Sequence, residues 1–129
     1  MSLKVTITEG KGGRSVVALE GRLDISTAPA CEAQIAPLLQ RRTKHLIFNL
    51  AKMDYLSTIG LRLLLTARKT LRSTGGRVLI THVQPQVARV LDVAEILPRT
   101  EIFDSVESAD MYLDALQRKE LVDKTDVDD

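Results

Sequence analysis

Apolar and polar residues alternate along the first part of the chain. Apolar side chains occupy every second position over residues 3–8, which is the period of a strand with one buried face. A glycine-rich turn follows at residues 10–13, and a valine-rich strand is expected over residues 15–19. We therefore expect an opening β-hairpin, with Gly21 breaking the run of its second strand.

The period changes to 3.6 after the hairpin, which indicates amphipathic helices. Ser26 and Thr27 are favoured N-cap residues, and Pro29 suits the first turn of a helix. Apolar residues then recur at intervals of three and four as far as Leu38. Because Pro37 lacks a backbone donor, we expect it to kink this helix or to end it early.

Strands and helices alternate over the remaining chain. Short apolar runs predict strands at residues 45–50, 77–81 and 102–103. Amphipathic runs predict helices that begin at Ser57-Thr58, at Pro85 and at the capping-box pair Asp104 and Glu107. This order favours the α/β class, with a mixed β-sheet: an opening hairpin, then mostly parallel strands, covered by about four helices.

The length of 129 residues suits a single domain. We expect that domain to span residues 1–117. The last segment, residues 118–129, is charged and weakly periodic, and we expect a frayed or disordered tail there.

Composition argues against several classes of function. The net charge of +1 and the aromatic content of 3% leave neither a clustered basic face nor stacking platforms, so we expect no nucleic-acid binding. One cysteine allows no internal disulfide, and with two histidines it is too little for a zinc site unless carboxylates supply most of the ligands. We expect no metal site and no cofactor. The sequence has no recognisable signal peptide or membrane span, so we expect a cytoplasmic protein without membrane contact.

The junction between the buried strand and the second helix holds two hydroxyl groups, those of Ser57 and Thr58. Free N–H groups and the helix dipole concentrate positive potential at such a start. A phosphate attached there would be stabilised locally, and its nearly two negative charges would repel a docked partner. Spacing alone favours the alternative interpretation, in which Ser57 is only the N-cap and Thr58 only the first helical residue.

Catalytic motifs are absent from the sequence. His45 and His82 belong to no recognisable triad, and neither a Gly-x-Ser-x-Gly elbow nor a phosphate loop that opens a helix occurs. A hydrolase would need a nucleophile with a positioned base. We therefore expect no catalytic residues, and a protein that is not an enzyme.

Three segments together resemble STAS domains. The run from Asp54 to Leu64 resembles the family's phosphorylation-site motif, which reads Asp-Ser-Ser-Gly-Leu or, in a common variant, Tyr-Ile-Ser-Ser-Ala-Gly-Leu-Arg. The family's first loop and fourth-strand region are resembled by Glu20-Gly21-Arg22-Leu23-Asp24 with Thr27-Ala28, and by Gly75-Gly76-Arg77-Val78-Leu79-Ile80 with Pro85, Val87 and Leu91. The resemblance covers roughly residues 3–116 and implies a STAS-like fold.

The resemblance implies phosphorylation at Thr58, because the family's acceptor lies two residues before the motif glycine. Ser57 stands where the commoner motif has Asp, and it is the alternate acceptor. The resemblance also implies that Asp24, in the first loop, lies close to the switch helix and orders the loop or meets the partner. The alternative is that Asp24 is an ordinary loop residue that holds its own turn. The residues implied to bind a partner are Asp24, Ser57, Thr58, Ile59, Gly60, Leu61 and Arg62.

The resemblance also implies a mechanism in bacterial transcription regulation. As an anti-sigma factor antagonist, the unphosphorylated protein would sequester an anti-sigma factor that is a serine/threonine kinase. Phosphorylation at Thr58 would release the kinase, and a metal-dependent protein phosphatase would reset the switch. Two alternatives within the family are a subunit of a stressosome-like signalling scaffold and a nucleotide-binding accessory protein of a transporter.

Overall fold

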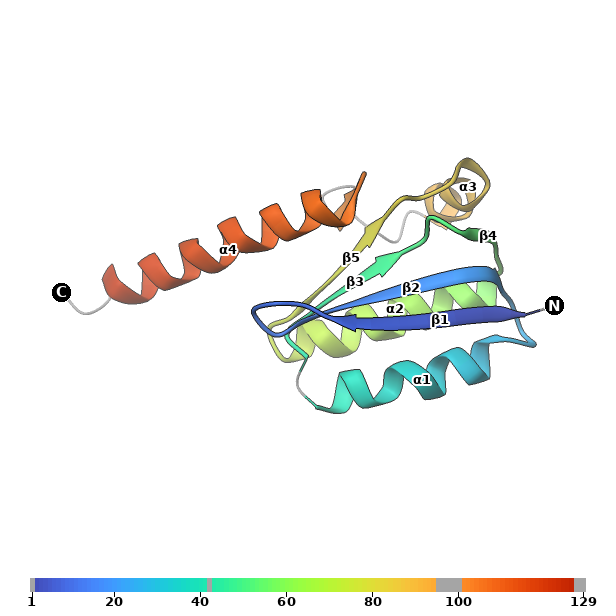
Figure 1. Ribbon diagram of the computed structural model, residues 1–129, viewed down its shortest axis with the longest axis horizontal. Coiled ribbons are helices and arrows are strands. Elements are labelled where there is room, and N and C mark those ends of the chain that lie inside the picture. The colour runs from blue at the N-terminus through green and yellow to red at the C-terminus, as the bar shows by residue number, and fades with distance from the viewer. Residues whose placement is uncertain (1, 42, 95–100, 127–129) are drawn as a thin grey trace.

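The computed structural model describes residues 2–41, 43–94 and 101–126 (Figure 1). Its elements, in chain order, are β1 (Leu3–Glu9), β2 (Arg14–Leu23), α1 (Ala28–Gln40), β3 (His45–Asn49), β4 (Met53–Leu56), α2 (Thr58–Ser73), β5 (Arg77–Thr81), α3 (Pro85–Ala94), β6 (Ile102–Phe103) and α4 (Val106–Asp126).

The strands form one mixed sheet with the order β1-β2-β3-β5-β6, and β4 pairs with β2 beyond the end of β3. β1 and β2 are antiparallel, and the other pairings are parallel. The fold class predicted from the sequence is therefore confirmed. The main apolar core lies between the sheet and helices α1 and α2, whereas α4 covers part of the opposite face (Figure 1).

Gly21 does not end the second strand, contrary to the sequence prediction. β2 continues to Leu23 because Gly21 adopts a φ of 108°, where a side chain would be strained. A Cβ at Gly21 would also lie 2.5 Å from the carbonyl oxygen of Ser2. The register shifts between Gly21 and Arg22, and the extra length of β2 pairs with β4, a strand that the sequence pattern did not predict.

Helix α1 begins after Thr27 and continues through Pro37 to Gln40. Of the two outcomes expected at Pro37, the early stop is therefore wrong, and the kink stays a prediction. Pro37 lies close to the helix end, where few turns remain to be disturbed, and its carbonyl oxygen still accepts a hydrogen bond from the Arg41 N–H at 3.0 Å.

The N-cap of α4 lies one residue later than the predicted cap, Asp104. The cap is Ser105, whose Oγ accepts a hydrogen bond from the Ser108 N–H at 3.1 Å. The helix then continues to Asp126, well into the segment expected to be a tail, and residues 127–129 lie outside the described residues. The domain boundary at residue 117 stays a prediction.

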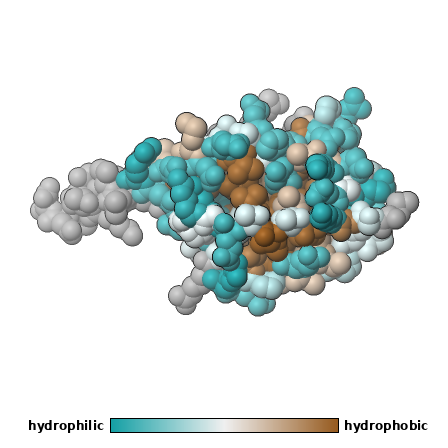
Figure 2. Space-filling view, in the orientation of Figure 1, coloured by the Kyte–Doolittle hydropathy of each residue, from teal (hydrophilic) through white to brown (hydrophobic). Residues whose placement is uncertain are grey.

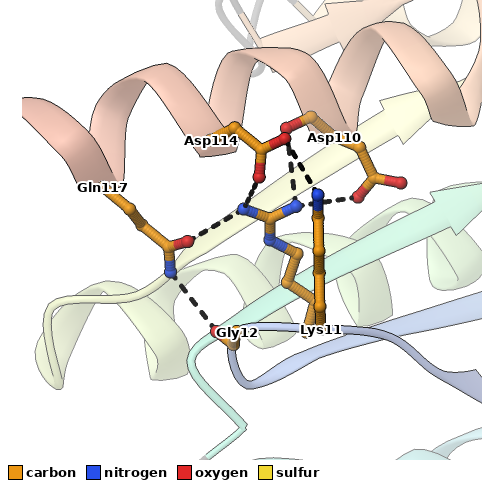
Figure 3. Close-up of polar contacts among 6 residues, drawn as sticks. Lys11, Gly12, Asp110, Asp114 and Gln117 are labelled. Atoms are coloured by element: carbon orange, nitrogen blue, oxygen red, sulfur yellow. Dashed lines mark hydrogen bonds and ion pairs between the residues drawn. The ribbon is translucent and has the colours of Figure 1, made fainter.

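The guanidinium group of Arg14 joins α4 to the opening hairpin. Figure 3 shows its partners Asp110, Asp114 and Gln117 on α4. The Arg14 side chain is 1% exposed. Nη1 lies 3.1 Å from Asp110 Oδ1, and Nη2 lies 2.7 Å from Asp114 Oδ1 and 2.8 Å from Gln117 Oε1. Lys11 Nζ approaches Asp114 Oδ2 at 3.1 Å. Ionic contacts therefore link the hairpin turn to the far end of the sequence.

Candidate functional site

Ser57 is the N-cap of α2. Its backbone is extended, with φ −88° and ψ 170°, and its Oγ accepts a hydrogen bond from the Gly60 N–H at 3.1 Å. The Ser57 N–H donates to the Leu23 carbonyl at 3.0 Å, and the Ser57 carbonyl accepts from the Leu61 N–H at 2.8 Å. The Ser57 hydroxyl therefore already has a structural task.

Thr58 is the first residue of α2, and its side chain is exposed. Within the described residues, no hydrogen bond engages the Thr58 hydroxyl or the backbone N–H groups of Thr58 and Ile59. The first N–H groups of a helix lack partners within the helix, and the helix dipole is positive at that end. An accessible hydroxyl thus lies beside donors that favour an anion.

Gly60 lets α2 approach the sheet closely. A Cβ there would lie 2.7 Å from Leu23 Cγ, 2.8 Å from the Leu23 carbonyl oxygen and 2.9 Å from Leu56 Cδ1. Real Cβ atoms do not come so close to other atoms, and a backbone carbonyl cannot easily move aside. The motif glycine therefore fixes the height of the helix start above β2 and β4.

Asp24 holds the loop that follows β2. Its Oδ1 accepts hydrogen bonds from Ser26 Oγ at 2.7 Å, Ser26 N at 3.0 Å and Thr27 N at 3.2 Å. The hydroxyl bond from Ser26 is the largest cause that holds the pKa of Asp24 below its ordinary value; desolvation opposes it, and the two backbone bonds and the charge of Arg22 lower the pKa further. The local role considered from the sequence is thus visible, while a role in partner binding stays a prediction.

The same loop lies beside the start of α2, because Leu23 accepts the hydrogen bond from the Ser57 N–H. The structure therefore brings the two predicted regions together. It also adds two exposed apolar side chains that the sequence analysis did not single out: Ile25, 74% exposed, and Tyr55, 41% exposed. The Arg22 guanidinium lies 4.0 Å above the centre of the Tyr55 ring. The sequence feature that could have indicated this surface is Ile25, an apolar residue between the polar residues Asp24 and Ser26.

The remaining predicted residues divide by exposure. Gly60 and Leu61 are buried, and they shape the start of α2. Ile59 and Arg62 are exposed, and they line one end of a groove of about 350 Å³ between α1 and α2. Thr58, Ile59 and Arg62 therefore form the accessible part of the predicted site.

The described residues offer little for metal or redox chemistry. Within residues 2–41, 43–94 and 101–126, no group of three or more His, Cys, Asp or Glu side chains could hold a metal ion. The Cys31 thiol is buried in the core, and burial raises its pKa to about 11, so that it is protonated near neutral pH. In this same part of the chain, no helix is long and apolar enough to cross a membrane.

The sequence matches the STAS domain family over residues 5–109. An anti-sigma F factor antagonist of Paenibacillus polymyxa is 28% identical over 110 residues, which make up 84% of this chain and 93% of that protein. An anti-sigma factor antagonist from Mycobacterium paratuberculosis has a similar crystal structure, with a TM-score of 0.77 and 23% identity over 86% of this chain and 93% of that chain. The phosphorylated form of the Bacillus cell fate determinant SpoIIAA is also similar, with a TM-score of 0.70 and 17% identity over 85% of this chain and 99% of that chain. Because the family match spans most of its length, this chain belongs to the STAS domain family.

Proposed function

We propose that this protein is an anti-sigma factor antagonist whose partner binding is controlled by phosphorylation of Thr58. The observation that carries the proposal is the exposed Thr58 side chain in the first turn of α2. A relative of the same fold is described in a phosphorylated form, and the Paenibacillus relative is named as an antagonist of an anti-sigma factor.

Thr58 is a better acceptor than Ser57 for a geometric reason. Ser57 Oγ caps α2 through the Gly60 N–H, and the Ser57 side chain is half-buried. Phosphorylation of Ser57 would disturb a cap that contributes about 1 kcal/mol to helix stability. Phosphorylation of Thr58 disturbs no hydrogen bond of its side chain among the described residues.

The electrostatic effect of a phosphate on Thr58 has two parts. Near the first N–H groups of α2 an exposed anion is stabilised by up to about 1 kcal/mol, so the modified helix start remains intact. The phosphate also adds nearly two negative charges next to the exposed Ile59, at the helix start that lies beside the loop carrying the exposed Ile25. A partner that covers these apolar side chains would have to bury that charge, and its affinity falls.

In the proposed cycle, the unphosphorylated protein binds an anti-sigma factor that is a serine/threonine kinase, and a sigma factor is set free. The kinase transfers the γ-phosphoryl group of ATP to Thr58 Oγ1, ADP leaves, and the hydroxyl proton passes to a base of the kinase. A metal-dependent protein phosphatase hydrolyses the phosphate ester and restores the hydroxyl. This chain contributes a positioned hydroxyl and a binding surface to the cycle.

The acceptor is tested by incubating the chain with its cognate kinase and ATP, followed by intact-mass measurement. We expect Thr58→Ala to remove the added phosphate and Ser57→Ala to retain it. Thr66→Ala, an exposed threonine of the same helix, is the matched control. Labelling of Thr58→Ala at the parent rate would refute Thr58 as the acceptor.

Repulsion of the partner by a negative charge at position 58 is tested separately, by measuring binding. Thr58→Asp should weaken binding to the kinase at least about tenfold, which corresponds to roughly 1.4 kcal/mol. Thr66→Asp, two turns further along α2, should change it much less. Equal affinities of Thr58→Asp and the parent chain would contradict a charge-based switch.

A further inference from the structure

The outer edge of β1 is open. β1 is the first strand in the sheet order, and no strand of the described part of the chain pairs with its other side. In Figure 1 it runs along the front of the molecule, and the element drawn below it is helix α1, not another strand. β1 has seven residues and contains no proline, and its register with β2 is unbroken. Natural proteins usually protect such an edge with bulges, prolines or charges.

The hydrogen bonds at the two ends of β1 show which backbone groups point outward. At one end, Gly10 N donates to Arg14 O, and at the other, Arg22 N donates to Ser2 O. In an antiparallel ladder the hydrogen-bonded positions alternate, so even-numbered residues of β1 pair with β2. The N–H and C=O groups of Leu3, Val5 and Ile7 therefore face the open edge.

The three residues whose backbone groups face the open edge are also the apolar residues of β1. Leu3 and Val5 are half-buried against the main core, and Ile7 is 36% exposed. Figure 2 shows apolar surface in the middle of this view, at the level of β1. Lys4, Thr6 and Thr8 are exposed on the other face of the strand.

We propose that β1 pairs with β1 of a second copy of this chain, antiparallel and about a two-fold axis at Val5. In this register Val5 lies opposite Val5 of the second copy, and Leu3 lies opposite Ile7. The residues that exchange backbone hydrogen bonds across the interface are therefore all apolar. Lys4 faces Thr6, and no like charges meet. A shift of two residues would instead place Leu3 opposite Glu9, which forms an ion pair with Arg41.

The pairing closes on itself. A two-fold axis uses the β1 edge of each copy and leaves β6, a strand of two residues, as the other edge. The two copies would then share one continuous sheet. Because β1 strands run antiparallel, the two α2 starts lie at opposite ends of the dimer, and this inference does not depend on the proposed function.

The association state is measured by sedimentation equilibrium of the full chain over a range of concentrations. We expect a reversible equilibrium between the 14.3 kDa monomer and a dimer of twice that mass. A chain that stays monomeric up to about 1 mM would overturn the proposal.

The register is tested with opposite charges at one exposed position. T6E places a carboxylate opposite Lys4 of the second copy, and T6K places a second ammonium group there. With two symmetric cross-strand pairs, T6E should lower the dimer dissociation constant and T6K should raise it, each by about fivefold. Shifts in the same direction for both variants, or no shift for either, would overturn this register.

The backbone pairing is tested by V5P. Proline at this position removes an N–H that faces outward, so the β1–β2 ladder keeps its hydrogen bonds. V5P should abolish the dimer, while urea unfolding checks that the monomer still folds. A variant that folds and still forms the dimer as well as the parent would show that β1 is not the interface. T66A, at an exposed position of α2, should leave the dimer unchanged.

Discussion

Helices α2 and α4 contact opposite faces of the same sheet, and they are held there by different chemistry. The buried face of α2 consists of Gly60, Leu61, Leu63, Leu64, Ala67 and Leu71, and all of these except Gly60 belong to the main apolar core. α4 buries Ala109 and Leu113 against Ile47 and Leu79, and its hydrogen bonds and ion pairs to Arg14 continue along the helix beyond them.

This difference indicates how firmly each helix is attached. Apolar burial depends little on salt or pH, whereas ion pairs with partly exposed partners are weakened by both. The side chains of Asp110 and Asp114 are 39% and 34% exposed. The helix that carries the proposed switch is therefore attached by the more robust means, and α4 is the element that solution conditions can loosen.

The largest expected effect comes from truncating matched leucines in the two helices. Leu64→Ala in α2 should lower the free energy of unfolding by about 4 kcal/mol, because a fully enclosed cavity remains. Leu113→Ala in α4 should cost about 2–3 kcal/mol, because α4 can shift to fill part of the space. Urea denaturation measures both. Equal losses would show that the two faces are packed equally well.

The next effect concerns the buried guanidinium. Arg14→Leu removes hydrogen bonds to charged groups and should cost about 2 kcal/mol, since each such bond contributes about 1.5–3 kcal/mol and the released carboxylates regain water. Hydrogen exchange should accelerate in α4 and remain unchanged in α2. Lys11→Ala, which removes only the exposed ion pair to Asp114, should have a much smaller effect. Uniform acceleration across both helices would contradict a local fastening.

A smaller effect is expected from the helix caps, which the two helices share. Ser57→Ala and Ser105→Ala should each cost about 1 kcal/mol, because each removes one side-chain acceptor at a helix start. Similar values would show that the helices differ in their packing and not in their caps. A loss above about 3 kcal/mol at Ser57 would indicate a further role for its hydroxyl.

The smallest effect should appear at acid pH. Hydrogen bonds from Arg14 and Lys11 hold the pKa of Asp114 below its ordinary value of 3.8. The folded state thus favours the carboxylate, so this stabilisation is present above pH 3.8 and is lost as the pH falls through the lowered pKa. The protection of the α4 amides against hydrogen exchange, taken relative to the intrinsic exchange rate at each pH, should therefore fall as the pH drops through the lowered pKa of Asp114. Asp114→Asn should lose this part of the pH dependence, and an unchanged profile would exclude Asp114 as its source.

Much of this architecture follows from local pattern. The alternation of residues 3–8 and the apolar runs at 45–50 and 77–81 predict strands that the structure contains, and the Ser57-Thr58 pair predicts the start of α2. These features depend on near neighbours in the sequence and on burial of one face. Local pattern is therefore sufficient for them.

Other features depend on contacts between distant residues. Four-residue β4 is stabilised as a strand by pairing with β2, and β2 itself extends only because Gly21 fits against Ser2. Arg14 looks like a surface residue in the sequence, and its burial arises from Asp110 and Asp114 about a hundred positions away. No periodicity of a single sequence encodes such pairings.

The close approach of α2 at Gly60 has a consequence for how a signal could be transmitted. The helix start rests directly on the Leu23 carbonyl, and neither inward movement nor an added side chain is accommodated there. A modification of the neighbouring Thr58 would therefore leave the position of the start of α2 on the sheet unchanged. Another protein would then detect the modification only through the change in surface electrostatic potential, and the backbones of the modified and unmodified chain would superimpose.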